Sequence, residues 1–241
     1  MSIESFKDAV TSLNERIKSE YSVYETGPIM DGALDLEEYF KSNLKIMWLM
    51  KEGYGDDFSY PDLFMKEFSK FTKDLVFGGP KNTWQPIVYV TYGILNNYMK
   101  FETMDNLKIL KDEEIIKQTL NKIVFVNIQK SPSVTGSNTD MRNIHNSNNN
   151  LLRNKLLWEQ INLLNPKIII CGNTFSVIKN DLGNPNQHQF NSKEEFVHHY
   201  IIGDRIYVDP NHPEITQARH QMDKGRYIDD IVRTVKKCLE I

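Results

Sequence analysis

Cysteine is scarce in this sequence. The 241 residues contain two cysteines, Cys171 and Cys238. Two thiolates cannot supply the four ligands of a Cys₄ zinc site or an iron–sulfur cluster, so both centres are excluded within one chain. So few cysteines are also typical of proteins from a reducing compartment.

Long apolar segments are also missing. No apolar run approaches the ~20 residues that a membrane-spanning helix needs, so we expect no membrane partner. The segment Met1–Tyr21 is charged and amphipathic and lacks the apolar core of a signal peptide. These features favour a cytoplasmic protein.

The chain has no excess of basic charge. Its 29 basic and 32 acidic residues give a net charge of −3, which counts against an indiscriminate, tight DNA binder. A local basic cleft stays possible, because the distribution of charge matters more than its sum. The length fits one α/β domain. We expect residues 1–241 to form a single domain, with 1–43 as a helical N-terminal extension packed on it.

Short apolar runs alternate with amphipathic segments along the chain. The runs predict strands at 44–50, 123–128 and 167–171, and a hairpin of 199–202 with 205–208. The amphipathic segments predict helices in the first forty residues, after a Ser2 N-cap, and at 34–42, 61–74, 84–98, 112–121, 152–164 and 227–239. This alternation predicts a three-layer α/β/α protein with a central, mostly parallel, four-stranded sheet.

Residues that carry chemistry follow the predicted strands. Ligands of an open α/β sheet bind outside the carboxyl ends of its strands. In chain order these ends offer Glu52, Tyr54 and Asp56, then Asn127, then Gly172 and Asn173, and finally His212. We therefore expect a carboxylate, an amide and an imidazole from distant parts of the chain to meet at one site.

Each of these residues also has a structural explanation. Glu52 or Asp56 is then a solvated turn residue, because loops are polar by default. Asn127 then satisfies backbone groups at a strand end, and His212 caps a turn. The adjacent His198 and His199 point to opposite faces of a strand, so we expect no metal site there.

Several of these segments resemble the uracil-DNA glycosylase superfamily. Val124–Pro132 is similar to the family's strand that ends in a base-reading Asn, and Pro166–Gly172 is similar to its next strand and turn. His212–Pro213 resembles the start of the family's His-Pro-Ser motif, although Glu214 follows. Met50–Tyr54 lies where the family has Gly-Gln-Asp-Pro-Tyr, without its Pro and first Gly. The chain thus resembles a divergent member that lacks the iron–sulfur cluster.

The resemblance implies catalytic roles for three of these positions. Glu52, or Asp56 in its place, would orient a water molecule and stabilise the cationic sugar. His212 would donate a hydrogen bond to the carbonyl oxygen of the leaving base. Asn127 would read the base edge, because an amide offers both a donor and an acceptor.

The resemblance also implies contacts to the base and to the DNA backbone. Tyr54 would exclude a thymine methyl group, and Gly172 and Asn173 would lie beside the base. Phe77 and Trp84 are candidates for stacking on it, with ordinary core packing as the alternative. The polar loop 131–150 would contact phosphates through Ser131, Ser133, Ser137 and Asn138, unless it is only a solvated loop.

The sequence therefore predicts a DNA glycosylase that acts on uracil or a related deaminated or damaged base. It would be a monomer that uses no cofactor and no metal. The alternatives are a non-catalytic relative that binds a nucleobase, a nucleotide or a protein partner, and a nucleoside hydrolase.

Overall fold

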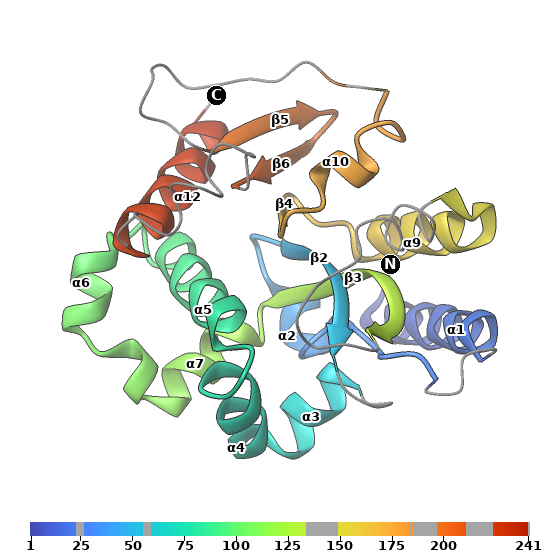
Figure 1. Ribbon diagram of the computed structural model, residues 1–241, viewed down its shortest axis with the longest axis horizontal. Helices are drawn as coiled ribbons and strands as arrows, with labels where there is room; N and C mark the ends of the chain where they lie inside the picture. Colours follow the sequence, from blue (N-terminus) through green and yellow to red (C-terminus); the bar gives the residue numbers. More distant parts are fainter. Residues whose placement is uncertain are drawn as a thin grey trace.

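The computed structural model describes residues 1–22, 27–54, 59–133, 149–183, 185, 197–210 and 224–240. Its centre is a six-stranded sheet with the order β1-β3-β2-β4-β6-β5 (Figure 1). The strands are β1 (Gly32–Ala33), β2 (Ile46–Tyr54), β3 (Ile123–Ser133), β4 (Ile168–Cys171), β5 (His198–Ile202) and β6 (Arg205–Asp209).

The sheet is mixed. Strand β2 pairs in parallel with β3 and β4, and β4 pairs in parallel with β6. The edge strands β1 and β5 run antiparallel to β3 and β6. The described residues thus form a sheet of six strands, four of which (β3, β2, β4 and β6) are parallel, where a sheet of four strands was predicted. Strand β1 escaped prediction because two residues are too short for a periodic pattern, whereas the predicted hairpin is present as β5 and β6.

Helices surround the sheet. They are α1 (Ile3–Tyr21), α2 (Leu36–Lys41), α3 (Tyr60–Lys66), α4 (Phe68–Phe71), α5 (Lys81–Leu95), α6 (Phe101–Asn106), α7 (Glu113–Leu120), α9 (Leu151–Leu164), α10 (Phe175–Ile178) and α12 (Lys224–Leu239), with the short turns η1 (Thr72–Val76) and η2 (Ile109–Lys111). None of the helices among the described residues is long and apolar enough to cross a membrane.

Local capping explains several of the boundaries. Ser2 caps α1 as predicted, because its side chain accepts a hydrogen bond from the Ser5 N–H. The helix predicted at 61–74 is instead broken into α3, α4 and η1. The break falls at Glu67, whose φ of −134° and ψ of 52° are not helical.

Strand β3 continues beyond its predicted end at Ile128. It stays paired with β2 at Glu52↔Gln129 and Tyr54↔Ser133, with a register shift between these two pairs. Residues 131–133, which were expected to open the polar loop, therefore belong to β3. Strand β2 likewise continues beyond its predicted end at Met50 and includes Gly53 and Tyr54.

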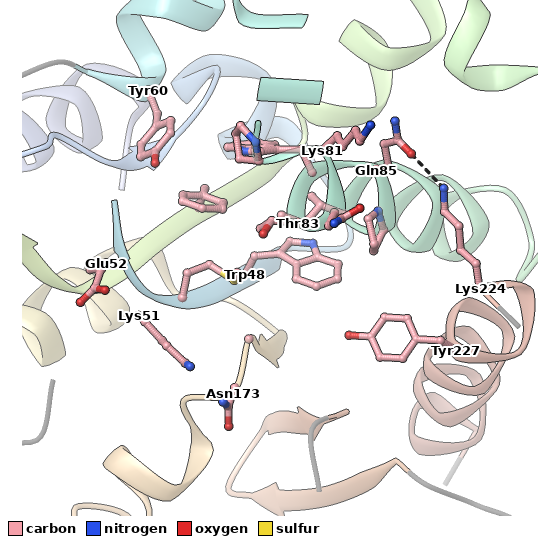
Figure 2. A pocket seen from close by; sticks show the side chains of 18 residues that line it. Trp48, Lys51, Glu52, Tyr60, Lys81, Thr83, Gln85, Asn173, Lys224 and Tyr227 are labelled. Atoms are coloured by element: carbon pink, nitrogen blue, oxygen red, sulfur yellow. Dashed lines mark hydrogen bonds between the residues drawn. The ribbon is translucent and has the colours of Figure 1, made fainter. Parts of the chain in front are cut away.

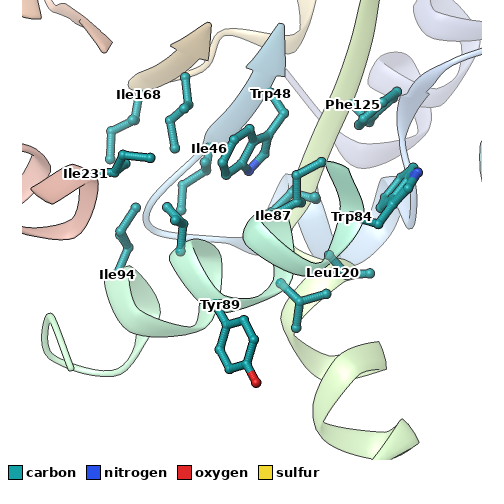
Figure 3. Close-up of a cluster of buried hydrophobic side chains, with 14 of the residues drawn as sticks. Ile46, Trp48, Trp84, Ile87, Tyr89, Ile94, Leu120, Phe125, Ile168 and Ile231 are labelled. Carbon is teal, nitrogen blue, oxygen red and sulfur yellow. The ribbon is translucent and has the colours of Figure 1, made fainter. Parts of the chain in front are cut away.

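The alternation along β2 divides the core between the two faces of the sheet. Ile46 and Trp48 pack into a cluster with α3, α4, α5, α7 and α12, part of which is drawn in Figure 3. Met47 and Leu49 point the other way, into a cluster with α1, α2, α9 and α10. Helices therefore cover both faces. Each large side chain buried in this way contributes about 1.5–3 kcal/mol.

A buried polar network holds the segment before β1 against β3 and α9. Lys130 Nζ lies 2.8 Å from both carboxylate oxygens of Asp31 and donates to Gln160 Oε1 at 2.8 Å. Gln160 Nε2 donates to Asp31 Oδ1 at 3.0 Å. Asp31 also accepts the backbone N–H of Asn127 at 2.7 Å. Because all the charges are matched, the network fixes the β3 backbone at Asn127.

Candidate functional site

A cavity of about 510 Å³ lies on the α5 side of the sheet and reaches the turn after β4 (Figure 2). Its sheet side is formed by Trp48, Met50, Lys51 and Glu52 of β2, Phe125 of β3, and Gly172 and Asn173. Its helical side is formed by Tyr60 of α3, the segment 80–87 at the start of α5, and Lys224 and Tyr227 of α12.

Close packing of the β4 turn against β2 shapes one end of this cavity. The Gly172 N–H and the Thr174 hydroxyl each donate to the Leu49 carbonyl oxygen at 2.8 Å. A Cβ at position 172 would clash with Sδ of Met50. Glycine at this position leaves room for the flexible end of the Met50 side chain, and Asn173 completes the turn in the left-handed region at φ 62°.

An aromatic wall forms the middle of the cavity. The rings of Trp84 and Phe125 stack with centroids 4.6 Å apart and planes at 16°. The Tyr60 ring lies 4.9 Å from Phe125 and 5.7 Å from Trp84. Trp48 is held beside this group by its indole N–H, which donates to Thr91 Oγ1 at 3.2 Å. The wall is apolar and almost fully buried, with exposed fractions of 1% for Trp84, 3% for Phe125 and 5% for Tyr60, so Trp84 packs in the core, the alternative to its predicted role in base stacking.

Glu52 and Asn127 lie on adjacent strands. Asn127 pairs with Met50, two residues before Glu52 along β2. Glu52 is 9% exposed and lines the cavity. Asn127 does not line the cavity. Its two neighbours do: Met50 on β2, and Phe125, which points to the same face of β3 as Asn127. The Asn127 side chain therefore points to the same face of the sheet as the cavity, beside Met50 and Phe125, but lies outside the lining.

The amide of Asn127 has no hydrogen-bond partner within the described part of the chain. The residue has an exposed fraction of 0%. Neither Oδ1 nor Nδ2 of its side chain has a hydrogen-bond partner among the described residues. Leaving a buried donor or acceptor unsatisfied costs about 1–3 kcal/mol for each group. Such a group in a native structure calls for an explanation, and a ligand that reaches it is one.

Lysines dominate the charge of the cavity. Lys51, Lys81 and Lys224 line it, whereas Glu52 is the one carboxylate among its lining residues that the structure describes. Lys224 Nζ donates to Gln85 Oε1 at 3.0 Å and lies 4.9 Å from the centre of the Tyr89 ring. Burial lowers the pKa of Lys224, and the nearby carboxylate of Asp105 opposes this effect. The cavity is thus suited to an anionic ligand.

The structure brings four of the predicted site residues to this cavity. They are Glu52, Trp84, Gly172 and Asn173. Phe77 is 45% exposed and does not line the cavity. Ser131 is a buried residue of β3 whose hydroxyl accepts a hydrogen bond from Gln129 Nε2 at 2.9 Å.

The remaining predicted residues fall wholly or partly outside the described structure. Asp56, Ser137, Asn138 and His212 lie outside the described residues. Tyr54 and Ser133 form the last positions of β2 and β3, but their side chains are outside the description. The convergence of Glu52, Asn127 and His212 at one site therefore stays a prediction, because Asn127 does not line the cavity and His212 lies outside the described residues.

Sequence reasoning missed several residues of the cavity. Tyr60, Lys81, Lys224 and Tyr227 come from helices and not from strand ends, so a search at the carboxyl ends of the strands passes over them. A weak signal was present at Lys81, which follows Gly78–Gly79–Pro80 in a predicted loop. Within the described residues, no group of three or more His, Cys, Asp or Glu side chains is placed to hold a metal ion.

Comparisons with known protein families, with characterised proteins and with solved structures found no match to this chain.

Proposed function

We propose that this chain is a DNA glycosylase that hydrolyses the bond between the sugar and uracil, or a related deaminated or damaged base. Its fold would be the three-layer α/β/α arrangement of the uracil-DNA glycosylase superfamily. The observation that carries the proposal is the buried Asn127 amide, which lies beside an aromatic cavity without a hydrogen-bond partner in the described structure.

The amide of Asn127 is complementary to a uracil edge. Uracil presents an N–H donor next to a carbonyl acceptor, and an amide offers an acceptor and a donor at matching separation. A base that enters between the aromatic wall and Asn127 satisfies both amide atoms at once. Met50 and Phe125 line the cavity beside the Asn127 side chain. A base that reaches Asn127 therefore requires the flexible Met50 side chain or the Phe125 ring to move. Enzymes of this kind take the base out of the stack into such a pocket.

Glu52 is placed to assist the cleavage. In the proposed reaction, the bond to the base breaks and the base leaves as an anion with the electron pair, water adds to the anomeric carbon, and the proton that the water loses ends on the base. The Glu52 carboxylate, at the edge of the same cavity, would orient the water and stabilise the positive charge on the sugar. His212, which resembles the family's histidine, would donate a hydrogen bond to the leaving base.

Base release from uracil-containing single- and double-stranded oligonucleotides tests this proposal. We expect the wild-type chain to release uracil and Asn127→Ala, Glu52→Gln and His212→Ala to lose most of that activity while keeping their circular dichroism spectra. Asn96→Ala is the matched control, since this exposed residue at the end of α5 does not line the cavity. Wild-type activity in Asn127→Ala would contradict the assigned base reading.

The lysine-rich lining supports a second candidate, a non-catalytic protein that binds a nucleobase or nucleotide in the same cavity. No release from a panel of damaged bases, together with retained uracil binding, would identify this alternative. Hydrolysis of free deoxyuridine without action on DNA would instead indicate a nucleoside hydrolase.

A further inference from the structure

We propose that Lys81 and Lys224 form an anion subsite in this cavity, which binds a phosphate of the DNA strand that carries the target base. This inference rests on the proposed function and deepens it, because it assigns the backbone contact to residues of α5 and α12. The predicted phosphate contacts belonged to the loop after β3 instead.

The two lysines are held on either side of one glutamine. Lys81 and Gln85 are four residues apart on α5, so their side chains lie on the same face of the helix. Gln85 Nε2 donates to the Val76 carbonyl oxygen at 3.1 Å, which turns Oε1 away from that carbonyl. Oε1 then accepts the hydrogen bond from Lys224 Nζ at 3.0 Å. Lys224 therefore lies beside Gln85, which is one helical turn from Lys81 on α5.

Neither lysine is matched by a carboxylate within ion-pair distance among the residues that the structure describes. Elsewhere lysines are matched, as in Lys41–Glu37 and Lys66–Asp62, both with N–O distances of 2.7 Å. The nearest acidic influence on Lys224 is Asp105, which accepts a hydrogen bond from the Tyr89 hydroxyl at 3.1 Å. Two lysines that line one cavity therefore offer it positive charge that an anion can neutralise.

The subsite is separate from the proposed base site. Figure 2 shows Glu52 and Lys224 at opposite sides of the cavity, with Trp48 and Thr83 between them. A base against the aromatic wall would thus leave room for an adjoining phosphate at the lysines. The amino terminus of the 15-residue helix α5 adds its positive partial charge at Lys81.

The salt dependence of DNA binding tests the subsite. A uracil-free single-stranded oligonucleotide is titrated with the full chain over a series of salt concentrations, which keeps base release out of the measurement. The slope of log affinity against log salt concentration is negative, and each lost phosphate contact reduces its magnitude by about 0.7. We expect that decrease for Lys81→Gln and Lys224→Gln, and about 1.4 for the double variant. With a slope smaller by 0.7, the ratio of wild-type to variant affinity rises by a further factor of about five for each tenfold decrease in salt concentration.

Matched variants separate this effect from general charge loss. Lys73→Gln removes one exposed positive charge that does not line the cavity, and Lys224→Arg keeps the charge; both should retain the wild-type slope. Circular dichroism of every variant checks that it is folded. An unchanged slope in the double variant, or no measurable oligonucleotide binding by the wild-type chain at low salt, overturns the subsite.

Small ligands identify the source of the phosphate. Calorimetry compares deoxyuridine monophosphate with deoxyuridine; a preference for the monophosphate that the double variant loses supports a phosphate site that also accepts free nucleotides. No such preference, with the slope change retained, supports a site that needs the continuous strand. If the slope changes but no base is released, the subsite is supported and the glycosylase assignment is contradicted. If base is released but the slope is unchanged, the glycosylase assignment is supported and the subsite is contradicted.

Discussion

Replacing Asn127 by leucine separates folding from ligand binding. The Asn127 side chain is fully buried, and neither of its polar atoms has a hydrogen-bond partner in the described structure. Leucine has a similar size and no polar group to desolvate. With about 1–3 kcal/mol for each unsatisfied group, Asn127→Leu should leave the free energy of unfolding unchanged or raise it by up to about 2 kcal/mol.

Gln160→Leu provides the contrast. Gln160 is also buried, but its amide binds two charged groups, Lys130 at 2.8 Å and Asp31 at 3.0 Å. Hydrogen bonds to charged groups contribute about 1.5–3 kcal/mol each, so this substitution should lower the free energy of unfolding by roughly 3 kcal/mol or more.

Urea unfolding of both variants, with uracil binding measured in parallel, checks this contrast. Asn127→Leu should keep or gain stability and lose uracil binding, whereas Gln160→Leu should lose stability. If Asn127→Leu instead lowers the free energy of unfolding by more than about 1 kcal/mol, the Asn127 amide has a structural partner in the folded chain and does not need a ligand.

Three further predictions concern the core, the turn after β4 and the response to alkaline pH. Lys130→Met should lower the free energy of unfolding by about 3–5 kcal/mol in urea titrations, because Asp31 stays buried without its cation; adding Asp31→Asn should recover part of the loss, and no recovery would contradict the ion-pair explanation. Gly172→Ala should displace the flexible end of the Met50 side chain, which lines the cavity, costing about 1 kcal/mol of stability and changing uracil binding in calorimetry, whereas wild-type values for both would contradict the close packing of this turn. Burial raises the pKa of Tyr89 and Tyr200 to about 12 and that of Cys238 to about 11. The unfolded chain loses these protons first, so the free energy of unfolding should fall from about pH 9 to about pH 12, and Cys238→Ala should flatten the part between pH 9 and 11 in urea titrations at each pH.

Strands with continuous apolar sequence were predictable, because burial on both faces of a sheet leaves a run of aliphatic residues. The run Ile168–Cys171 is fully buried and was placed within one residue. The polar end of β3 was not predictable, since Gln129 to Ser133 lack such a pattern and are strand only through pairing with β2. The same limit explains β1, which is held by its pairing with β3 and by the neighbouring Asp31 network.

The site was predictable where it depends on strand ends and not where it depends on helix packing. Glu52, Gly172 and Asn173 follow from the rule that ligands bind at the carboxyl ends of strands. Lys224 and Tyr227 reach the cavity because α12 packs beside α5, a long-range contact that no local pattern encodes. The buried lysine Lys130 was equally hidden, because its acidic partner lies 99 residues away in sequence.

A crystal structure of the chain grown with uracil shows directly whether the base binds in the cavity through the Asn127 amide. We expect the uracil ring to lie against the wall formed by Trp84, Phe125 and Tyr60, with both amide atoms of Asn127 within hydrogen-bond distance of the base. Uracil bound without contact to Asn127, or absent from the cavity at saturating concentration, would contradict this expectation.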